Sequence, residues 1–464
     1  MKAHIMDHPK AYGTAALTVA FAAGALVTLG FKDFYPDLEK RYQDTRKSTK
    51  HSHSKDSQGL SRHGSVSHPA SGRRRSSYFF FEPVELEDHE SEEDVGDYLP
   101  RIADGIEDCI GNTPLIKIKS LSEATGCTIL AKVEFLNAAG QSTKDRVALN
   151  MIREAEEQGL LVPHRGDTIY EGTVGSTGIS LATLARAMGY KAHICMPDDQ
   201  SIEKSTLLHH LGATVERVPV APITSPNHFV NLARTRAKEH TLTSKDGSRG
   251  FFADQFESKA NFQAHVRTTG PEIWYQTEGK LDAFVAGAGT GGTISGVAKY
   301  LKEERKMTNL RVVLADPQGS GLYNRVKHGV MYSSTEKEGT RRRQQVDTMV
   351  EGIGINRITE NFEAGRELVD DAVKVTDDQA CRMARWLVEN DGVFAGSSSA
   401  VNCVASVVTA LNLPKGSTVV TILCDPGSRH VSKFYQHVAD MGLEEEEHHD
   451  LLSTLCLEQY RRPT

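Results

Sequence analysis

The sequence predicts an α/β fold with two open, mostly parallel twisted sheets flanked by helices, preceded by a transmembrane helix. Three observations support this prediction. Short β-prone runs alternate with helical runs beyond Leu99, glycine-rich turns separate them, and an uncharged segment lies near the amino terminus. Such alternation is typical of parallel sheets whose two faces are both covered by helices.

Composition bounds the class of protein. The chain has 464 residues, of which 39% are hydrophobic, enough for two packed cores. Its formal net charge of -7 gives no domain-wide basic field, so we expect no nucleic-acid partner. The seven cysteines are scattered without the close paired spacing of a zinc site or a disulfide framework. We therefore expect reduced thiols and no metal site.

The eighteen residues 14–31 carry no charge and follow a short tail, residues 1–13. At about 1.5 Å per residue they are just long enough to cross a bilayer core of about 30 Å, which predicts a transmembrane helix. A secretory signal and a mitochondrial import segment are the alternatives. Six lysines and arginines lie between residues 32 and 50 and only two precede the span, so we expect the catalytic core to face the cytosol. The short span with basic flanks suggests the mitochondrial outer membrane.

Residues 32–98 are rich first in Ser, His, Lys and Arg and then in Glu and Asp. So little apolar content cannot offset the entropy of ordering, which predicts a disordered charged linker. We expect the core at 99–440, with a smaller mobile lobe at about 150–250. Residues 441–464, which contain EEEEHHD, are expected to form an acidic extension at the surface.

The alternation within the core can be followed in order. Residues 167–171 form a β-prone run that enters a glycine turn, and Leu181, Leu184 and Met188 then recur at helical spacing until Gly189. Further strands are expected at 191–196, 214–218, 282–286, 311–315 and 418–424, and helices at 202–211 and 293–302. Ligands of open α/β folds bind beside the carboxyl ends of the strands, so we expect the site between the two sheets.

The loop GAGTGGT, residues 287–293, lies between a predicted strand and a predicted helix. Glycines allow backbone N–H groups to approach an anion, and a helix amino terminus adds partial positive charge, so a phosphate fits there. The loop also satisfies GxGxxG, and Asp316 lies near the end of the next strand, so a nicotinamide dinucleotide is an alternative ligand. The hydroxyls of TGGT favour a compact phosphate monoester.

Two further segments bear on the chemistry. NAAGQSTKDR, residues 137–146, places Lys144 in a polar loop ahead of an apolar helical run. An isolated lysine there would usually be a surface residue. However, EGTVGSTG, residues 171–178, is a strand-to-helix turn suited to a carboxylate. A phosphate cradle, a lysine and a carboxylate cradle together are what imine chemistry on an amino acid requires.

These motifs resemble a known family, the β-family (fold type II) of pyridoxal-phosphate enzymes, and within it cysteine synthase (O-acetylserine sulfhydrylase) and cystathionine β-synthase. The resemblance spans about residues 106–434. It is carried by IGNTPL (110–115), STKDR, the turn at Thr173, AHVRTTGPEIWYQT (264–277), GTGGT, VEGIG (350–354), FAGSSSA (394–400) and DPGSRH (425–430).

The resemblance implies pyridoxal 5'-phosphate as the cofactor and a role for each matching residue. Lys144 is implied to be catalytic and to hold the cofactor as an imine, and Ser398 to face its pyridine nitrogen. The phosphate cradle is implied to be Gly289, Thr290, Gly291, Gly292 and Thr293. The substrate carboxylate is implied to bind at Thr173, Val174, Gly175, Thr177 and Gln255, and Gly354 to line the entrance.

The chain departs from the family pattern at two places. The usual TSGNTG reads TVGSTG, so Ser176 stands where an asparagine contacts the cofactor's 3-hydroxyl, and Val174 replaces a hydroxyl donor. The usual NP after the glutamine is replaced by Ser258 and Lys259. Both departures bear on substrate preference.

The implied activity is β-replacement that makes cysteine from O-acetylserine and sulfide. Alternatives are cystathionine synthesis from serine and homocysteine, or elimination of the serine-dehydratase type. From other classes, a nicotinamide-dependent oxidoreductase and a catalytically weak membrane-bound scaffold that binds pyridoxal phosphate remain open. The implied partners are an amino-acid substrate, sulfide or a thiol, and a second copy of the chain in a homodimer, besides the membrane through residues 14–31.

Overall fold

The computed structural model describes residues 102–200, 202–331, 348–442 and 450–461. The predicted tail 1–13, transmembrane helix 14–31 and linker 32–98 lie outside these residues. Within the described ranges, no helix is both long and apolar enough to cross a bilayer.

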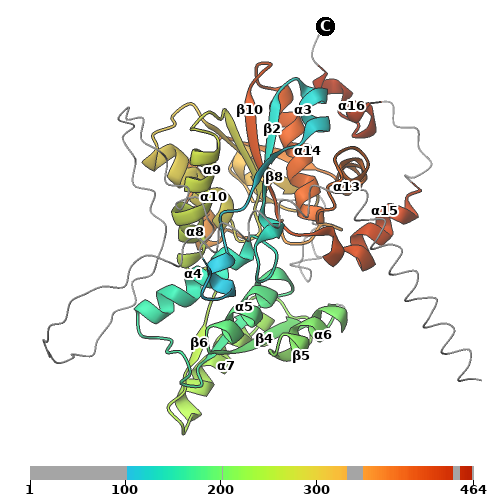
Figure 1. The fold of residues 1–464 in the computed structure, drawn as a ribbon. Coiled ribbons are helices and arrows are strands. Elements are labelled where there is room, and N and C mark those ends of the chain that lie inside the picture. Colours follow the sequence, from blue (N-terminus) through green and yellow to red (C-terminus); the bar gives the residue numbers. More distant parts are fainter. Residues whose placement is uncertain (1–101, 201, 332–347, 443–449, 462–464) are drawn as a thin grey trace, which may run out of the picture. The chain divides into compact units, whose positions relative to one another are not determined.

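The large sheet has six strands in the order β1-β2-β10-β7-β8-β9 (Figure 1). β1 pairs antiparallel with β2, and all other neighbours are parallel. The carboxyl-terminal strand β10 lies between β2 and β7, so the beginning and end of the core meet in one sheet. The strands are β1 (Leu115–Lys117), β2 (Thr128–Val133), β7 (Ala283–Gly287), β8 (Arg311–Pro317), β9 (Asp371–Val375) and β10 (Thr418–Leu423).

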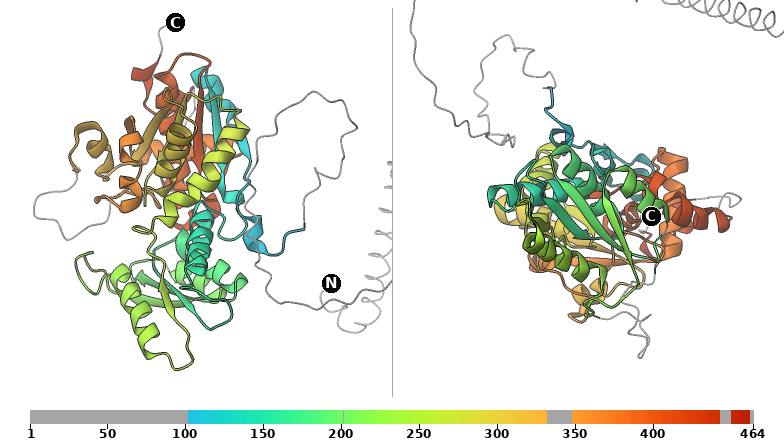
Figure 2. Two further views of the ribbon diagram at one scale, coloured as in Figure 1. Left: turned by 90° about the vertical axis from the view of Figure 1, so that its left-hand side faces the viewer. Right: turned by 90° about the horizontal axis from the view of Figure 1, so that it is seen from below.

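The small sheet has four parallel strands in the order β5-β4-β3-β6. In the left view of Figure 2 this sheet and its helices, in green, form a lobe of their own beside the large sheet. The strands are β3 (Thr168–Gly172), β4 (Lys191–Pro197), β5 (Thr214–Val218) and β6 (Gly250–Phe252). Two mostly parallel sheets flanked by helices confirm the α/β part of the predicted fold class.

Helices connect the parallel strands, as right-handed crossovers require. The helices are α3 (Lys119–Thr125), α4 (Lys144–Glu157), α5 (Ser176–Ala187), α6 (Ile202–His210), α7 (Phe229–Thr243), α8 (Ala260–Ala264), α9 (Gly270–Gln276), α10 (Gly292–Ala298), α11 (Leu322–His328), α12 (Glu360–Glu363), α13 (Asp377–Asp391), α14 (Ser397–Leu411), α15 (Gln436–Asp440) and α16 (Leu451–Thr454). Wider π-type turns at His265–Thr269, Lys299–Glu304 and Val431–Tyr435 extend α8, α10 and the start of α15.

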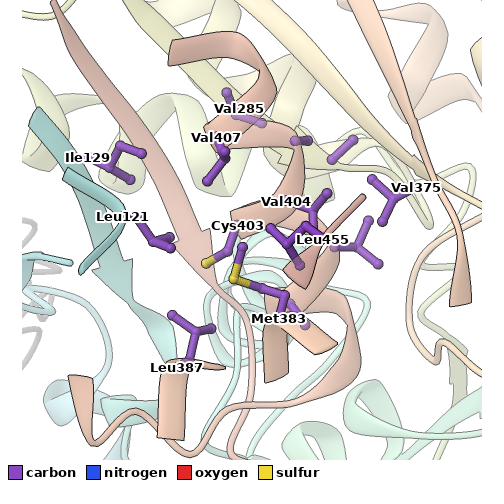
Figure 3. Packing of buried hydrophobic residues seen from close by; sticks show 14 of the residues in the cluster. Leu121, Ile129, Val285, Val375, Met383, Leu387, Cys403, Val404, Val407 and Leu455 are labelled. Atoms are coloured by element: carbon purple, nitrogen blue, oxygen red, sulfur yellow. The ribbon is translucent and has the colours of Figure 1, made fainter. Parts of the chain in front are cut away.

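Both faces of the large sheet are buried. Alternate residues of a strand point to opposite faces, and in β10 Val419 and Leu423 join one core cluster while Val420 and Ile422 join another. The first cluster includes side chains from α3, α13 and α14, among them Leu121, Met383 and Val404 (Figure 3). Each fully buried aliphatic side chain of this kind contributes about 1.5–3 kcal/mol.

The predicted elements agree with the structure within one or two residues at most positions, and 214–218 matches β5. Strands β1, β2, β6 and β9 were not expected from the sequence. β2 contains Lys132, which is fully buried and interrupts the apolar run that would reveal a central strand. β9 escaped prediction for a similar reason, because its strand contains Lys374, whose side chain pairs with Asp316.

The predicted acidic extension 441–464 is described only at residues 441–442 and 450–461, so its glutamate run lies outside the described residues. Within residues 450–461, Asp450 caps α16 by accepting the N–H groups of Leu452 and Ser453. Leu451 and Leu455 are buried in the core cluster of the large lobe. A few leucines therefore anchor this segment to α3 and α13.

Candidate active site

Lys144 is the first residue of α4. Its Nζ lies 3.3 Å from Thr143 Oγ1, and the N–H of Thr143 donates to the carbonyl oxygen of Cys424 at 3.3 Å. Burial lowers the pKa of Lys144, and charges at Cys424, Asp425 and Glu134 oppose that effect. A lowered pKa makes the amine neutral more often near pH 7, which attack on an aldehyde requires.

The glycine-rich loop follows β7 and enters α10. A Cβ on Gly289 would overlap the carbonyl oxygen of Gly352, and one on Gly292 would overlap Asn261 Oδ1. Gly291 has φ +83° and passes close to Phe362. Only glycine therefore fits these positions, and the backbone N–H groups of the loop stay accessible to an anion.

Threonine hydroxyls complete this cradle. Asn261 Nδ2 donates to Thr290 Oγ1 at 2.9 Å, and Thr293 Oγ1 lies 3.2 Å from His265 Nε2. Burial, together with the positive charges of Arg146 and Lys144, lowers the pKa of His265 well below its usual range. The ring beside the cradle is therefore neutral at physiological pH.

The turn from β3 into α5 consists of the loop residues Thr173, Val174 and Gly175 and the first two residues of α5, Ser176 and Thr177. The N–H of Thr173 donates to the carbonyl oxygen of Cys195 at 3.1 Å, and the N–H of Gly175 donates to Thr173 Oγ1 at 3.4 Å. Ser176 opens the twelve-residue helix α5. The loop therefore ends at a helix amino terminus, whose partial positive charge favours the binding of a carboxylate.

Gln255 joins the carboxylate loop to the phosphate cradle. Thr177 Oγ1 donates to Gln255 Oε1 at 2.6 Å. Asn261 Nδ2 donates to the carbonyl oxygen of Gln255 at 2.7 Å and, as above, to Thr290. One chain of hydrogen bonds therefore runs from Thr177 to Thr290, so the two predicted loops belong to one site.

Ser398 and Gly354 border the same site. Ser398 is buried in the first turn of α14, where its hydroxyl acts to lower the pKa of the Cys424 thiol against the larger effect of burial. Burial raises the pKa of Cys424 to about 11, so that thiol is neutral at physiological pH. The N–H of Gly354 donates to the carbonyl oxygen of Ala288 at 2.9 Å, which places loop 350–354 alongside the glycine-rich loop.

Asp316, the acid that a nicotinamide dinucleotide would need, is engaged within the protein. Its Oδ2 pairs with Lys374 Nζ at 3.0 Å and accepts the N–H of Tyr323 at 2.8 Å. The side chain is fully buried. These contacts occupy Oδ2, and Oδ1, which has no hydrogen-bond partner among the described residues, is also buried, so burial of the carboxyl argues against the dinucleotide interpretation of GxGxxG.

The donor set fits pyridoxal phosphate. Glycine N–H groups and threonine hydroxyls suit its phosphate, Lys144 suits its aldehyde, and the Ser398 hydroxyl suits its ring nitrogen. Asn261 Oδ1 is a buried oxygen without a hydrogen-bond partner among the described residues, and it faces Gly292 in the cradle. Nothing in this set calls for a metal.

His193, Cys195 and Glu216 do bring three metal-type ligand atoms within 4.8 Å of one another in the small lobe. Both Glu216 oxygens, however, accept hydrogen bonds from Arg236, at 2.9 and 3.1 Å. Burial raises the pKa of Cys195 to about 12, which keeps the thiol protonated. The three residues therefore belong to an ion-pair network, in which Arg236 of α7 binds Glu216 of β5 and holds the helix against the small sheet.

A buried charge network lies behind Lys144. Arg146 binds Glu134 through Nε at 2.8 Å and Nη2 at 2.9 Å, and it binds Glu272 through Nη1 at 2.5 Å and Nη2 at 2.8 Å. Lys132 Nζ lies 2.5 Å from Glu272. These charges hold Glu272 ionised, with its pKa lowered to about 2 against the opposing effect of burial. The network fixes the start of α4 to β2 and α9.

Glu171 is a buried carboxyl at the end of β3, directly before the carboxylate loop. Its oxygens accept the N–H groups of Gly172 at 3.1 Å and Gln255 at 3.3 Å. Burial, reinforced by the charge of Asp254, raises the pKa of Glu171 to about 8. Its protonation therefore changes near neutral pH, beside the residue that contacts Thr177.

We expect the Glu171→Gln variant to gain stability relative to the wild type as pH rises. The folded-state pKa lies above the unfolded value, so the stabilisation from protonated Glu171 is complete below about pH 4.5 and is lost as pH rises through about 8. Each pKa unit corresponds to about 1.4 kcal/mol, so the gain is on the order of a few kcal/mol. Urea unfolding across this pH range measures it.

The exposed Glu123 supplies a matched control for this prediction. Its change to Gln should alter the free energy of unfolding by less than about 0.5 kcal/mol at every pH. A constant difference between Glu171→Gln and wild type from acid to alkaline pH would contradict the assigned protonation.

Sequence reasoning gave no role to several residues that the fold brings to the site. Arg146, Glu171, Asp425 and His430 all lie within motifs that were recognised. Their burial, with partners far away in the sequence, is what identifies them. The available signal was a charged residue inside a glycine-rich or lysine-bearing motif, which can only be interpreted once the neighbours are known.

The fold and the site together define a class. The family described as "Pyridoxal-phosphate dependent enzyme" matches residues 106–425, and the chain belongs to this family. Its cofactor is pyridoxal phosphate.

Particular relatives narrow the class. The chain is 69% identical to Cysteine synthase 2 of Neurospora crassa over 464 residues, which cover 99% of this chain and 100% of that protein. It is 57% identical to a Saccharomyces cerevisiae protein provisionally named mitochondrial cysteine synthase, over 75% of this chain and 88% of that protein. The crystal structure of O-ureido-L-serine synthase is similar with a TM-score of 0.62 at 30% identity, covering 75% of this chain and 98% of that one.

Proposed function

We propose that this chain makes cysteine from O-acetylserine and sulfide by pyridoxal-phosphate-dependent β-replacement. The observation that carries the proposal is the 69% identity, across 99% of the chain, to Cysteine synthase 2 of Neurospora crassa. The site supports it, because a chain of hydrogen bonds joins the carboxylate loop to the phosphate cradle, and the half-buried Lys144 lies at the start of α4.

Lys144 holds the cofactor and moves the proton at the substrate Cα. When bound, the cofactor supplies a ring that withdraws electrons from Cα. The lowered pKa of Lys144 allows Nζ to accept the Cα proton, and the same nitrogen can return it later in the cycle. The Ser398 hydroxyl would hold the ring nitrogen of the bound cofactor as a neutral group, and a neutral partner would favour loss of the group at Cβ over long-lived charge at Cα.

The carboxylate loop orients the substrate. The amino terminus of α5 receives the substrate carboxylate, and Gln255 positions this helix start by accepting the hydroxyl proton of Thr177. Val174 is 38% exposed and offers an apolar side chain in place of a hydroxyl. The smaller lobe that carries this loop closes over the substrate and excludes water, and Gly354 lines its entrance.

Product analysis on the full-length holoenzyme tests the proposal. Three mixtures are compared: O-acetylserine with sulfide, serine with sulfide, and serine with homocysteine. We expect cysteine from the first at least about tenfold faster than any product of the others, a difference of about 1.4 kcal/mol in barrier. Faster formation of cystathionine, or pyruvate release at the same rate with and without sulfide, would replace this proposal with another.

The carboxylate loop gives a second, local prediction. Thr177→Val removes the hydroxyl that Gln255 holds while keeping the shape of the side chain. We expect KM for O-acetylserine to rise about tenfold, because a buried hydrogen-bonding position loses a partner worth about 1–2 kcal/mol. The exposed Thr235→Val serves as the control. An unchanged KM would remove Thr177 from the substrate site.

The wider organisation is part of the proposal. The enzyme is a homodimer tethered through residues 14–31 and linker 32–98, with its core facing the cytosol at the mitochondrial outer membrane. The span and its basic flanks support this location, and so does the mitochondrial name of the Saccharomyces cerevisiae relative. Fluorescent tagging of the full chain that showed only endoplasmic reticulum would contradict it.

A further inference from the structure

Asp425 lies in the loop after β10 and is about nine-tenths buried. Its Oδ2 accepts a hydrogen bond from His430 Nε2 at 3.0 Å, and Ser176 Oγ lies 3.5 Å from the same oxygen. Ser176 belongs to α5 of the small lobe, whereas Asp425 and His430 follow β10 of the large lobe. The contact therefore bridges the two lobes beside Lys144.

Three buried atoms of this loop have no hydrogen-bond partner among the described residues: Asp425 Oδ1, His430 Nδ1 and Arg429 Nη1. Asp425 Oδ1 and the His430 ring both crowd Gly396, where a Cβ would overlap them. Close packing thus fixes the carboxylate in place. A buried, incompletely paired carboxylate of this kind is costly unless a positive charge faces it.

The titratable group on the active-site side of this loop is Lys144, and the loop is held next to it because the N–H of Thr143 donates to the carbonyl oxygen of Cys424. Burial lowers its pKa, and Cys424, Asp425 and Glu134 act in the opposite direction. The Cys424 thiol is neutral at physiological pH because its own pKa is about 11. Asp425 is then the leading negative charge that acts on Nζ.

We propose that Asp425, fixed by His430, is a positioning residue that holds a proton at Lys144 Nζ, whether that nitrogen is free or joined to the cofactor, and that orients the Ser176 hydroxyl across the two lobes. The inference rests on the proposed role of Lys144 and assigns a second residue, Asp425, to the control of its proton. The charged or titratable groups that face these two residues are Glu134, Cys424, His265, Arg429, His430 and Tyr435.

The test follows the visible absorbance of the full-length holoenzyme as a function of pH. Loss of the negative charge in Asp425→Asn should release the proton at Nζ at lower pH, so the spectral midpoint should fall by about one pH unit or more. The acidic limb of kcat/KM should move in the same direction by a similar amount. A residue with a merely structural role would lower activity without moving either midpoint.

Variants of His430 separate a positioning role of Asp425 from a merely structural role. His430→Gln keeps an N–H donor for Asp425, and we expect the wild-type midpoint; His430→Phe removes the donor, and we expect the midpoint of Asp425→Asn. The exposed Asp440→Asn is the matched control and should leave the midpoint unchanged. If Asp425→Asn fails to fold, the two His430 variants decide the question.

The outcomes are distinguishable. Wild-type holoenzyme without any visible band would overturn the proposed function itself. A normal band whose midpoint is the same in wild type, Asp425→Asn and His430→Phe would overturn this inference and leave the proposed function intact.

Discussion

Replacing Lys144 with alanine lowers kcat by a factor of about 10³ or more and removes the visible absorbance of the bound cofactor. Proton transfer by a positioned side chain contributes about 10²–10⁴ to a rate, and Lys144 also supplies the covalent bond. Lys132, which is fully buried, cannot replace it, because its Nζ is bound to Glu272 and to the carbonyl oxygen of Thr113. Steady-state kinetics and the absorbance spectrum of the purified variant measure both effects.

Lys119 provides the control. It is also the first residue of a helix, α3, but it is exposed and lies outside the site. Lys119→Ala should keep the rate and the spectrum of the wild type. Turnover by Lys144→Ala at more than about a tenth of the wild-type rate would contradict the assignment of the catalytic lysine.

Replacing Arg146 with methionine destabilises the fold by about 3–5 kcal/mol, because it removes one member of a buried charge network and leaves the others uncompensated. The guanidinium makes four hydrogen bonds to Glu134 and Glu272 at 2.5–2.9 Å. Without it, Lys132 alone faces two carboxylates in the protein interior. Urea unfolding of the holoenzyme near pH 7 measures the loss.

Arg267→Met is the matched control, since Arg267 pairs with Glu154 at 3.0 Å but is 45% exposed. A pair of this type contributes less than about 1 kcal/mol. The network also predicts acid sensitivity: the pKa of Glu272 is lowered, so its stabilisation is present above about pH 4.5 and is lost as pH falls toward 2. Equal losses in Arg146→Met and Arg267→Met would contradict the account of the network.

The sequence was sufficient for the α/β fold class, and the loops that it predicts for the site are joined in the structure by hydrogen bonds. Glycine spacing between a β-prone and a helical run predicts an anion cradle at 287–293, and only glycine fits where the backbone approaches Gly352 and Asn261. Lys144 could be assigned only together with the other two loops. A lone lysine at a helix start has no distinguishing local feature.

What the sequence could not give depends on tertiary contacts. Lys132 hides the central strand β2 because a buried lysine is rare and its partner, Glu272, is distant along the chain. Likewise, the role proposed for Asp425 depends on His430, Ser176 and Lys144, which the fold brings near it. These neighbours cannot be identified from a local sequence pattern.

The central claim is a covalent bond between Lys144 and pyridoxal phosphate, and borohydride reduction of the holoenzyme tests it most directly. Reduction followed by peptide mass spectrometry should place the cofactor mass on the peptide that contains Lys144 and on no other. Label on a different lysine, or no label on protein reconstituted with pyridoxal phosphate, would contradict the account.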